Sequence, residues 1–142
     1  MSGMTALCRG VVLGLLLSAA GPALAEQPSA KLCTDPSFGA PQIAACMETA
    51  AAGADKRLND AYRKAISIIE KDSDRTPEQK VAWRQALLVS ERAWTAFRDA
   101  DCGDLTVIEW NSGSGTGTAI AACRYDKTVQ RTAELLARYP LH

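Results

Sequence analysis

Four cysteines, Cys33, Cys46, Cys102 and Cys123, are the residues of this sequence with the most chemical potential. A cysteine can act as a thiolate nucleophile, bind zinc or form a disulfide, depending on its surroundings. Zinc binding is disfavoured because the four contain no C-x-x-C pair and no histidine stands near them. Two disulfides are therefore expected, provided that the chain folds in an oxidising compartment.

The first 25 residues predict export. Arg9 is the only charge before the apolar run 11–17, and Ala23-Leu24-Ala25 has small residues at the two positions that a signal peptidase reads. We expect cleavage before Glu26, so that the first mature residue is not a cysteine that could carry a lipid. The product is expected to be periplasmic or secreted. An uncleaved anchor is the alternative, although the run is shorter than the ~20 apolar residues of a membrane span. No later segment is apolar enough to span a bilayer.

Composition excludes some partners. The whole chain has 16 basic and 16 acidic residues, and loss of Arg9 with the leader leaves 15 against 16. Nucleic acid is not expected as a partner because no basic stripe is present. The length suits one domain, with an N-terminal arm over residues 26–40 and a helical domain over residues 41–142.

Apolar residues that recur at threes and fours predict an all-α fold with no strand. The first helix is expected over residues 41–71. Gly53 lies inside this pattern and costs up to about 1 kcal/mol relative to alanine, so two shorter helices are the alternative.

A second helix is expected to begin after Thr76, which can form a capping box with Gln79 and is followed by Pro77 in the first turn. Its pattern continues at least to residue 100 and on to Trp110. A third helix is expected over residues 118–139. The predicted architecture is a small bundle of three main helices, in which the second and third form an antiparallel hairpin.

The hairpin suggests how the cysteines pair. Spacing alone leaves three connectivities open. The centre of the turn lies near residues 112–113, so Cys102 and Cys123 stand about ten residues to either side of it, at the same height, as a bridge requires. Geometry therefore favours Cys102–Cys123, which leaves Cys33 to pair with Cys46 and tie the arm to the first helix.

One face of the second helix carries Trp94, Arg98 and Cys102 at intervals of four. If Cys102 faces the third helix, Arg98 falls near Asp126 and Trp94 near Arg131. We predict a partly buried cluster of these four side chains, with an arginine over the indole ring. Locking of two helices is one interpretation of this cluster, and binding of an anion by the two arginines is the other.

Three motifs resemble the N-terminal domain family of the lysozyme inhibitor LprI, from Cys33 to Leu135. The departures from the family pattern are Glu91, where many relatives have glutamine, and the looser turn at residues 111–114. The motifs are Asp55-x-x-Leu58-Asn59-x-x-Tyr62, Glu91-Arg92-Ala93-Trp94-x-x-x-Arg98-Asp99-Ala100-x-Cys102 and Cys123-x-x-x-x-Thr128-x-x-Arg131-x-x-x-Leu135.

The resemblance implies a small exported helical protein whose fold is held by the cysteines and the motif side chains. It also implies a non-catalytic binding protein that inhibits lysozyme-type peptidoglycan hydrolases. The element that we expect to enter a glycan cleft is the turn after the second helix, which composition predicts to be flexible. The expected structural residues are Trp94, Arg98, Asp99, Asp126, Thr128 and Arg131, and the expected binding loop is Asn111, Ser112, Gly113, Ser114 and Gly115.

An enzyme is disfavoured. The only histidine is the last residue, His142, and Asp99 and Asp101 lie on different helical faces. We predict no catalytic residue, metal or cofactor, and a protein partner. The alternative function is a general envelope interaction or structural module, for which a patch of Trp83, Trp110 and Tyr125 would be the contact surface, unless these side chains pack in the core.

Overall fold

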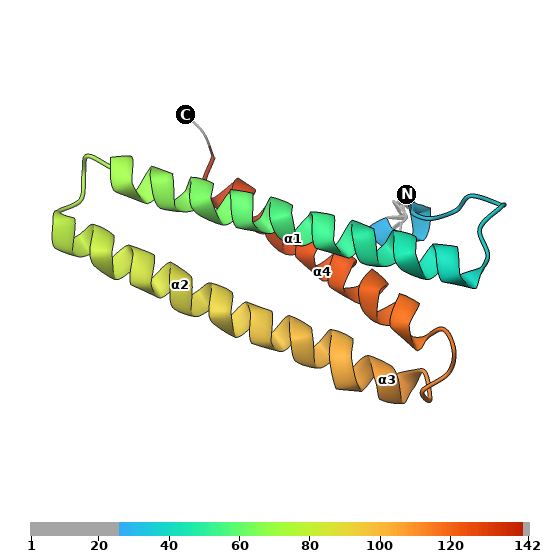
Figure 1. Ribbon diagram of the computed structural model, residues 1–142. Helices are drawn as coiled ribbons and strands as arrows, with labels where there is room; N and C mark the ends of the chain where they lie inside the picture. Colours follow the sequence, from blue (N-terminus) through green and yellow to red (C-terminus); the bar gives the residue numbers. More distant parts are fainter. Residues whose placement is uncertain (1–25, 141–142) are drawn as a thin grey trace, which may run out of the picture.

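The computed structural model describes residues 26–140, so the leader expected over residues 1–25 and the terminal histidine lie outside the described residues. Three long helices form the body (Figure 1), and the described part contains no strand. These helices are α1 (Ala40–Lys71), α2 (Pro77–Ala100) and α4 (Thr116–Arg138); the short elements are the 3₁₀ helix η1 (Pro28–Lys31), the π-helical turn η2 (Asp101–Leu105) and α3 (Thr106–Glu109). The all-α prediction is confirmed.

Helix α1 is continuous through Gly53, as the first of the two alternatives expected. Alanines on both sides of this glycine favour the helix and offset its cost. At the start of α2, Thr76 Oγ1 accepts a hydrogen bond from the Gln79 amide at 3.3 Å, and Gln79 Oε1 accepts one from the Thr76 amide at 2.9 Å. This reciprocal pair is the predicted capping box.

The expected run of one helix to Trp110 is interrupted. Helix α2 passes into a π-helical turn in which Gly103 has non-helical angles, φ −100° and ψ −110°. The Thr106 hydroxyl donates to the Asp101 carbonyl at 3.1 Å and satisfies part of the broken ladder. Such turns bend a helix, and the periodic apolar pattern that predicted helix on both sides does not reveal them.

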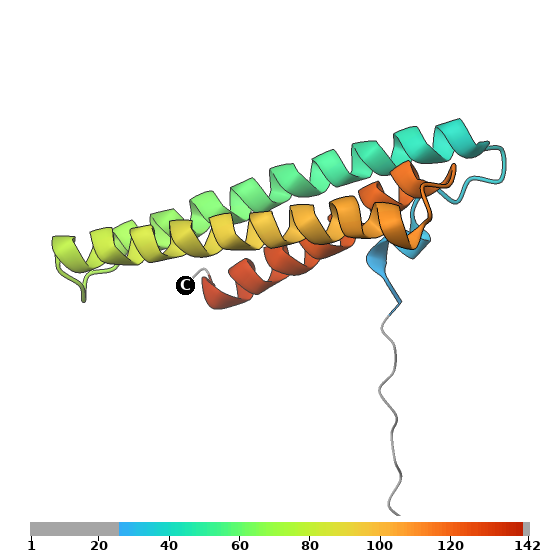
Figure 2. The same cartoon turned by 90° about the horizontal axis from the view of Figure 1, so that it is seen from below.

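Helices α1 and α4 run side by side in the same direction, whereas α2 runs back against them (Figures 1 and 2). The buried residues of the pair recur every seven positions, which keeps them on one face of each helix. Most are small, so the two backbones approach closely. The recurring positions are Met47, Ala54 and Ala61 on α1, and Ala121, Thr128 and Leu135 on α4.

A larger apolar core lies at the far end of the bundle, where all three long helices meet. It is built around Ile69, Leu87 and Leu135. Tyr139 closes it, and its hydroxyl accepts a hydrogen bond from the Trp83 indole at 3.2 Å. Leu87 is the one apolar side chain of α2 in the buried class, at 4% exposure, and it belongs to this core.

Two disulfides form as predicted. Cys33 bonds to Cys46 with their Cα atoms 5.9 Å apart, and Cys102 bonds to Cys123 with their Cα atoms 5.5 Å apart. The second bond joins the end of α2 to α4 and confirms the antiparallel hairpin. The first ties the N-terminal arm to the start of α1.

Replacing both Cys102 and Cys123 with alanine should lower the free energy of unfolding by about 3 kcal/mol, because the unfolded chain loses a constraint. The matched control replaces Cys33 and Cys46. There we expect a smaller loss, since the arm can detach locally while the helices stay packed. Denaturant titration of both variants without reductant measures the difference. Equal losses would contradict this division between a bond within the bundle and a bond to its arm.

Candidate functional site

Arg98 joins all three long helices. Its side chain is only 11% exposed, and Nη1 donates to Asp55 Oδ1 of α1 at 2.6 Å and to Thr128 Oγ1 of α4 at 3.0 Å. Nε and Nη2 both donate to Asp99 Oδ1 at 3.1 Å. The guanidinium carbon lies 5.3 Å from the centre of the Trp94 ring, within cation–π range.

Arg131 forms the second link, from α4 to α2. Its guanidinium donates to Glu91 Oε1 through Nε and Nη2, and Nη1 donates to Glu134 Oε2 at 2.9 Å. The hydrogen bonds that Arg131 donates to Glu91 raise the pKa of Arg131, burial opposes this, and Glu134 adds to the rise. Carboxylates therefore occupy both arginines, which favours helix locking over anion binding.

The four side chains expected in one cluster belong to separate contacts. Trp94 lies against Arg98 rather than Arg131. Asp126 turns away to η1, where it accepts hydrogen bonds from the Ser29 amide at 2.7 Å and the Ser29 hydroxyl at 2.6 Å. The prediction placed only two helices opposite each other. It omitted α1, whose Asp55 supplies the carboxylate that Asp126 was expected to give.

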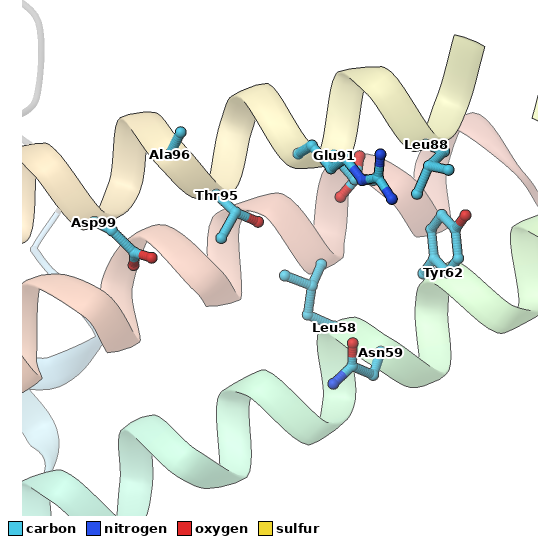
Figure 3. A pocket seen from close by; sticks show the side chains of 9 residues that line it. Leu58, Asn59, Tyr62, Leu88, Glu91, Thr95, Ala96 and Asp99 are labelled. Atoms are coloured by element: carbon cyan, nitrogen blue, oxygen red, sulfur yellow. The ribbon is translucent and has the colours of Figure 1, made fainter. Parts of the chain in front are cut away.

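A groove of about 420 Å³ lies between α1 and α2. In Figure 3, Leu58 and Tyr62 of α1 point toward Leu88 and Thr95 of α2. We call it the inter-helix groove; its lining is Leu58, Asn59, Tyr62, Leu88, Glu91, Arg92, Thr95, Ala96 and Asp99. Sequence reasoning missed this groove, although the first two motifs supply most of its lining. Asn59 and Tyr62 share a helix face by their spacing of three, which was the available signal.

The turn after α3 has a defined backbone. Asn111 and Ser112 have φ angles of 50° and 54°. The Ser112 amide donates to the Val107 carbonyl and the Asn111 amide to the Ile108 carbonyl, each at 3.0 Å. This is a Schellman motif, with asparagine at the left-handed position that glycine most often fills. The predicted flexible turn is thus hydrogen bonded.

The hairpin tip, which we define as residues 105–115, presents apolar and polar groups together. Ile108 is 75% exposed and Trp110 is 53% exposed. The Trp110 ring lies against Gly115, where an added Cβ would come within 2.8 Å of Cζ3. Beside the indole, a groove of about 600 Å³ runs between the first turns of α1 and α4. The four residues Asn111 to Ser114 are exposed next to it.

The patch proposed from Trp83, Trp110 and Tyr125 does not form. Trp83 packs on Tyr139 near the start of α2, with 6.0 Å between ring centres. Trp110 belongs to the hairpin tip, on the order of 40 Å away along the helical segment at 1.5 Å per residue. Tyr125 is partly buried on α4.

A family model described as lysozyme inhibitor LprI matches residues 33–135. The chain belongs to this family. Neither the curated proteins nor the solved structures give a match. In residues 26–140, no helix has both the length and the apolar character needed to cross a membrane.

Membership of the LprI family is consistent with a protein partner and with a role other than catalysis, because the family is described by inhibition. The matched range contains both disulfides, both arginine links, the inter-helix groove and the hairpin tip. Among the side chains expected to hold the fold, Arg98, Thr128 and Arg131 make hydrogen bonds between helices, whereas Asp99 accepts from Arg98 of its own helix. The groove and the tip are two surfaces that a partner can reach.

Replacing Arg98 with alanine should lower the free energy of unfolding by about 1–3 kcal/mol, because charged hydrogen bonds to two other helices are lost. This loss in the free energy of unfolding is smaller than for breaking a fully buried ion pair, since Asp55 and Asp99 are about half exposed. Arg63→Ala is the control. Arg63 pairs with Asp60 on the surface at 71% exposure and should contribute under about 0.5 kcal/mol. Similar thermal midpoints for the two variants would refute the proposed role of Arg98.

Proposed function

We propose that this protein is an exported, non-catalytic inhibitor of a lysozyme-type peptidoglycan hydrolase, and that the hairpin tip enters the enzyme's substrate cleft. The family supports inhibition as the activity. The observation that points to the tip is the exposure of Ile108 and Trp110 directly beside the polar residues 111–114. Buried tryptophans supply much of the binding energy in protein interfaces, and a polar rim suits a cleft built to bind sugar hydroxyls.

The tip also has the shape and order that this role needs. It lies at the end of the bundle where α3 leads into α4, near the start of α1 (Figures 1 and 2). The Schellman hydrogen bonds fix its backbone, and the bond between Cys102 and Cys123 closes its base. A segment that is already ordered loses less conformational entropy on binding, which favours affinity.

Export agrees with the two disulfides, since such bonds persist in oxidising compartments. The near-balanced charge, 16 basic and 16 acidic residues in the whole chain, provides little long-range attraction. We therefore expect inhibition to depend weakly on salt concentration, because shape complementarity rather than steering would determine affinity.

Lysis of peptidoglycan by a c-type lysozyme, measured with equimolar and tenfold amounts of the oxidised mature protein, tests the proposal. Wild-type protein should inhibit in proportion to dose. Ile108→Asp should weaken inhibition about tenfold or more, since a charge would enter the apolar contact. The matched control is Val89→Asp on α2, where the valine is 55% exposed and lies outside the tip.

Two results would overturn parts of this proposal. No inhibition at tenfold excess would reject the role against that lysozyme class and leave the general envelope interaction module. Equal weakening by Ile108→Asp and Val89→Asp, with both proteins folded by circular dichroism, would reject the tip as the inhibitory surface.

A further inference from the structure

The inter-helix groove is a second surface, separate from the hairpin tip, and its chemistry indicates a ligand of its own. We propose that it binds an uncharged glycan, such as a chain of N-acetylated amino sugars. This inference does not depend on lysozyme inhibition, because none of the lining residues belongs to the tip.

The two acidic residues of the groove lining, Glu91 and Asp99, each pair with an arginine outside the lining. Glu91 accepts hydrogen bonds from Arg131, and Asp99 accepts them from Arg98. In each case the arginine binds a single carboxylate oxygen, Oε1 of Glu91 and Oδ1 of Asp99. Within the described residues the other oxygen of each has no protein partner, so it remains an acceptor for a ligand. Because Arg98 also pairs with Asp55 and Arg131 also pairs with Glu134, each charge is only partly compensated, and the groove offers two carboxylate oxygens that can accept from the hydroxyl or amide donors of an uncharged ligand.

The remaining polar side chains supply both kinds of hydrogen-bonding group. The Asn59 amide donates and accepts, as do the hydroxyls of Tyr62 and Thr95, and the Arg92 guanidinium donates. In residues 26–140 none of these four side chains makes a hydrogen bond within the protein. Sugar hydroxyls and acetamido groups also act as donors and acceptors, so they would satisfy such a set.

Apolar surface lies between these groups. Leu88 of α2 lies opposite the Tyr62 ring of α1, and Leu58 projects into the groove one turn further along α1 (Figure 3). The α2 residues of the lining extend from position 88 to 99, about 16 Å at the rise of an α-helix. An elongated ligand with apolar ring faces and polar edges fits this alternation.

Other ligand classes fit less well. An anion would approach the carboxylates of Glu91 and Asp99 with only Arg92 in the lining to attract it. An extended peptide that binds by strand addition finds no sheet edge, since the walls here are helices whose backbone bonds are already used. A proline-rich peptide needs an aromatic-lined groove, and Tyr62 is the one aromatic residue of this lining. A helical peptide would place apolar side chains over the Asn59, Thr95 and Asp99 polar groups and leave them without partners.

Titration of the isotope-labelled, oxidised mature protein with tetra-N-acetylchitotetraose, followed by amide NMR shifts, tests the proposal. We expect saturable shifts confined to α1 near residues 58–62 and α2 near residues 88–99. Asn59→Ala and Arg92→Ala should each weaken binding about fivefold to tenfold, the effect of one lost polar contact. Arg57→Ala is the matched control, because Arg57 is exposed on α1 outside the groove lining and should leave the affinity unchanged.

Cellotetraose serves as a second probe, and binding of either sugar in the groove supports the proposal. Tighter binding of the chitotetraose would assign recognition to its acetamido groups. The proposal is overturned if neither sugar gives saturable shifts at millimolar concentration, or if the shifts map to the tip. It is also overturned if Arg57→Ala weakens binding as much as Arg92→Ala does, with both variants giving the spectrum of the folded protein. Ile108→Asp should leave sugar binding intact, which separates this test from that of the inhibitor.

Discussion

Two arginine side chains supply the hydrogen bonds that join the C-terminal half of α2 to the other helices, ahead of the Cys102–Cys123 disulfide. Close packing of small residues brings α1 and α4 together, whereas the one buried apolar side chain of α2, Leu87, lies near the middle of that helix, before its C-terminal half. In that half Arg98 reaches α1 and α4 at once, and Arg131 reaches back from α4 to Glu91. A planar guanidinium with five donors can hold several acceptors in fixed directions, which an ammonium group cannot do.

The same links shape the surface. Two helices joined by an arginine side chain lie further apart than two helices in contact through alanines. Helix α2 therefore stands away from α1 where the Arg98–Asp55 hydrogen bond joins them, and the inter-helix groove lies in the space between the two helices. The guanidiniums bind one oxygen of Glu91 and one of Asp99, and within the described residues the second oxygen of each carboxylate has no protein partner. The features that hold the fold therefore also determine the character of the groove.

Local signals in the sequence were sufficient to locate the long helices. Periodicity located α1 and α4 to within two residues, and Thr76 with Gln79 marked the start of α2. The turn gave the register of the hairpin and with it both disulfides. The parallel pairing of α1 and α4 was not predicted, since it depends on three helices meeting and no single segment encodes it.

Side-chain partners were harder to foresee for the same reason. Arg98 pairs with Asp55, which is 43 positions away and was never considered as its partner. At the tip, the glycines at 113 and 115 suggested flexibility, whereas Asn111 and Ser112 adopt the left-handed conformation and neither glycine has a positive φ. The inter-helix groove was missed because its residues come from two motifs that had been assigned only to the fold.

The positions of the two disulfides have a consequence for proteolysis. Cys102–Cys123 spans the exposed residues 111–114, so a cut there would leave α2 and α4 covalently joined. Within residues 26–140 no disulfide spans the connector between α1 and α2, because Cys33–Cys46 lies wholly before Asp72 and Cys102–Cys123 wholly after it. One cut in that connector would separate the chain into two fragments held by non-covalent contacts alone. The resistance of the protein to proteases would then depend on this short polar segment rather than on the exposed residues 111–114.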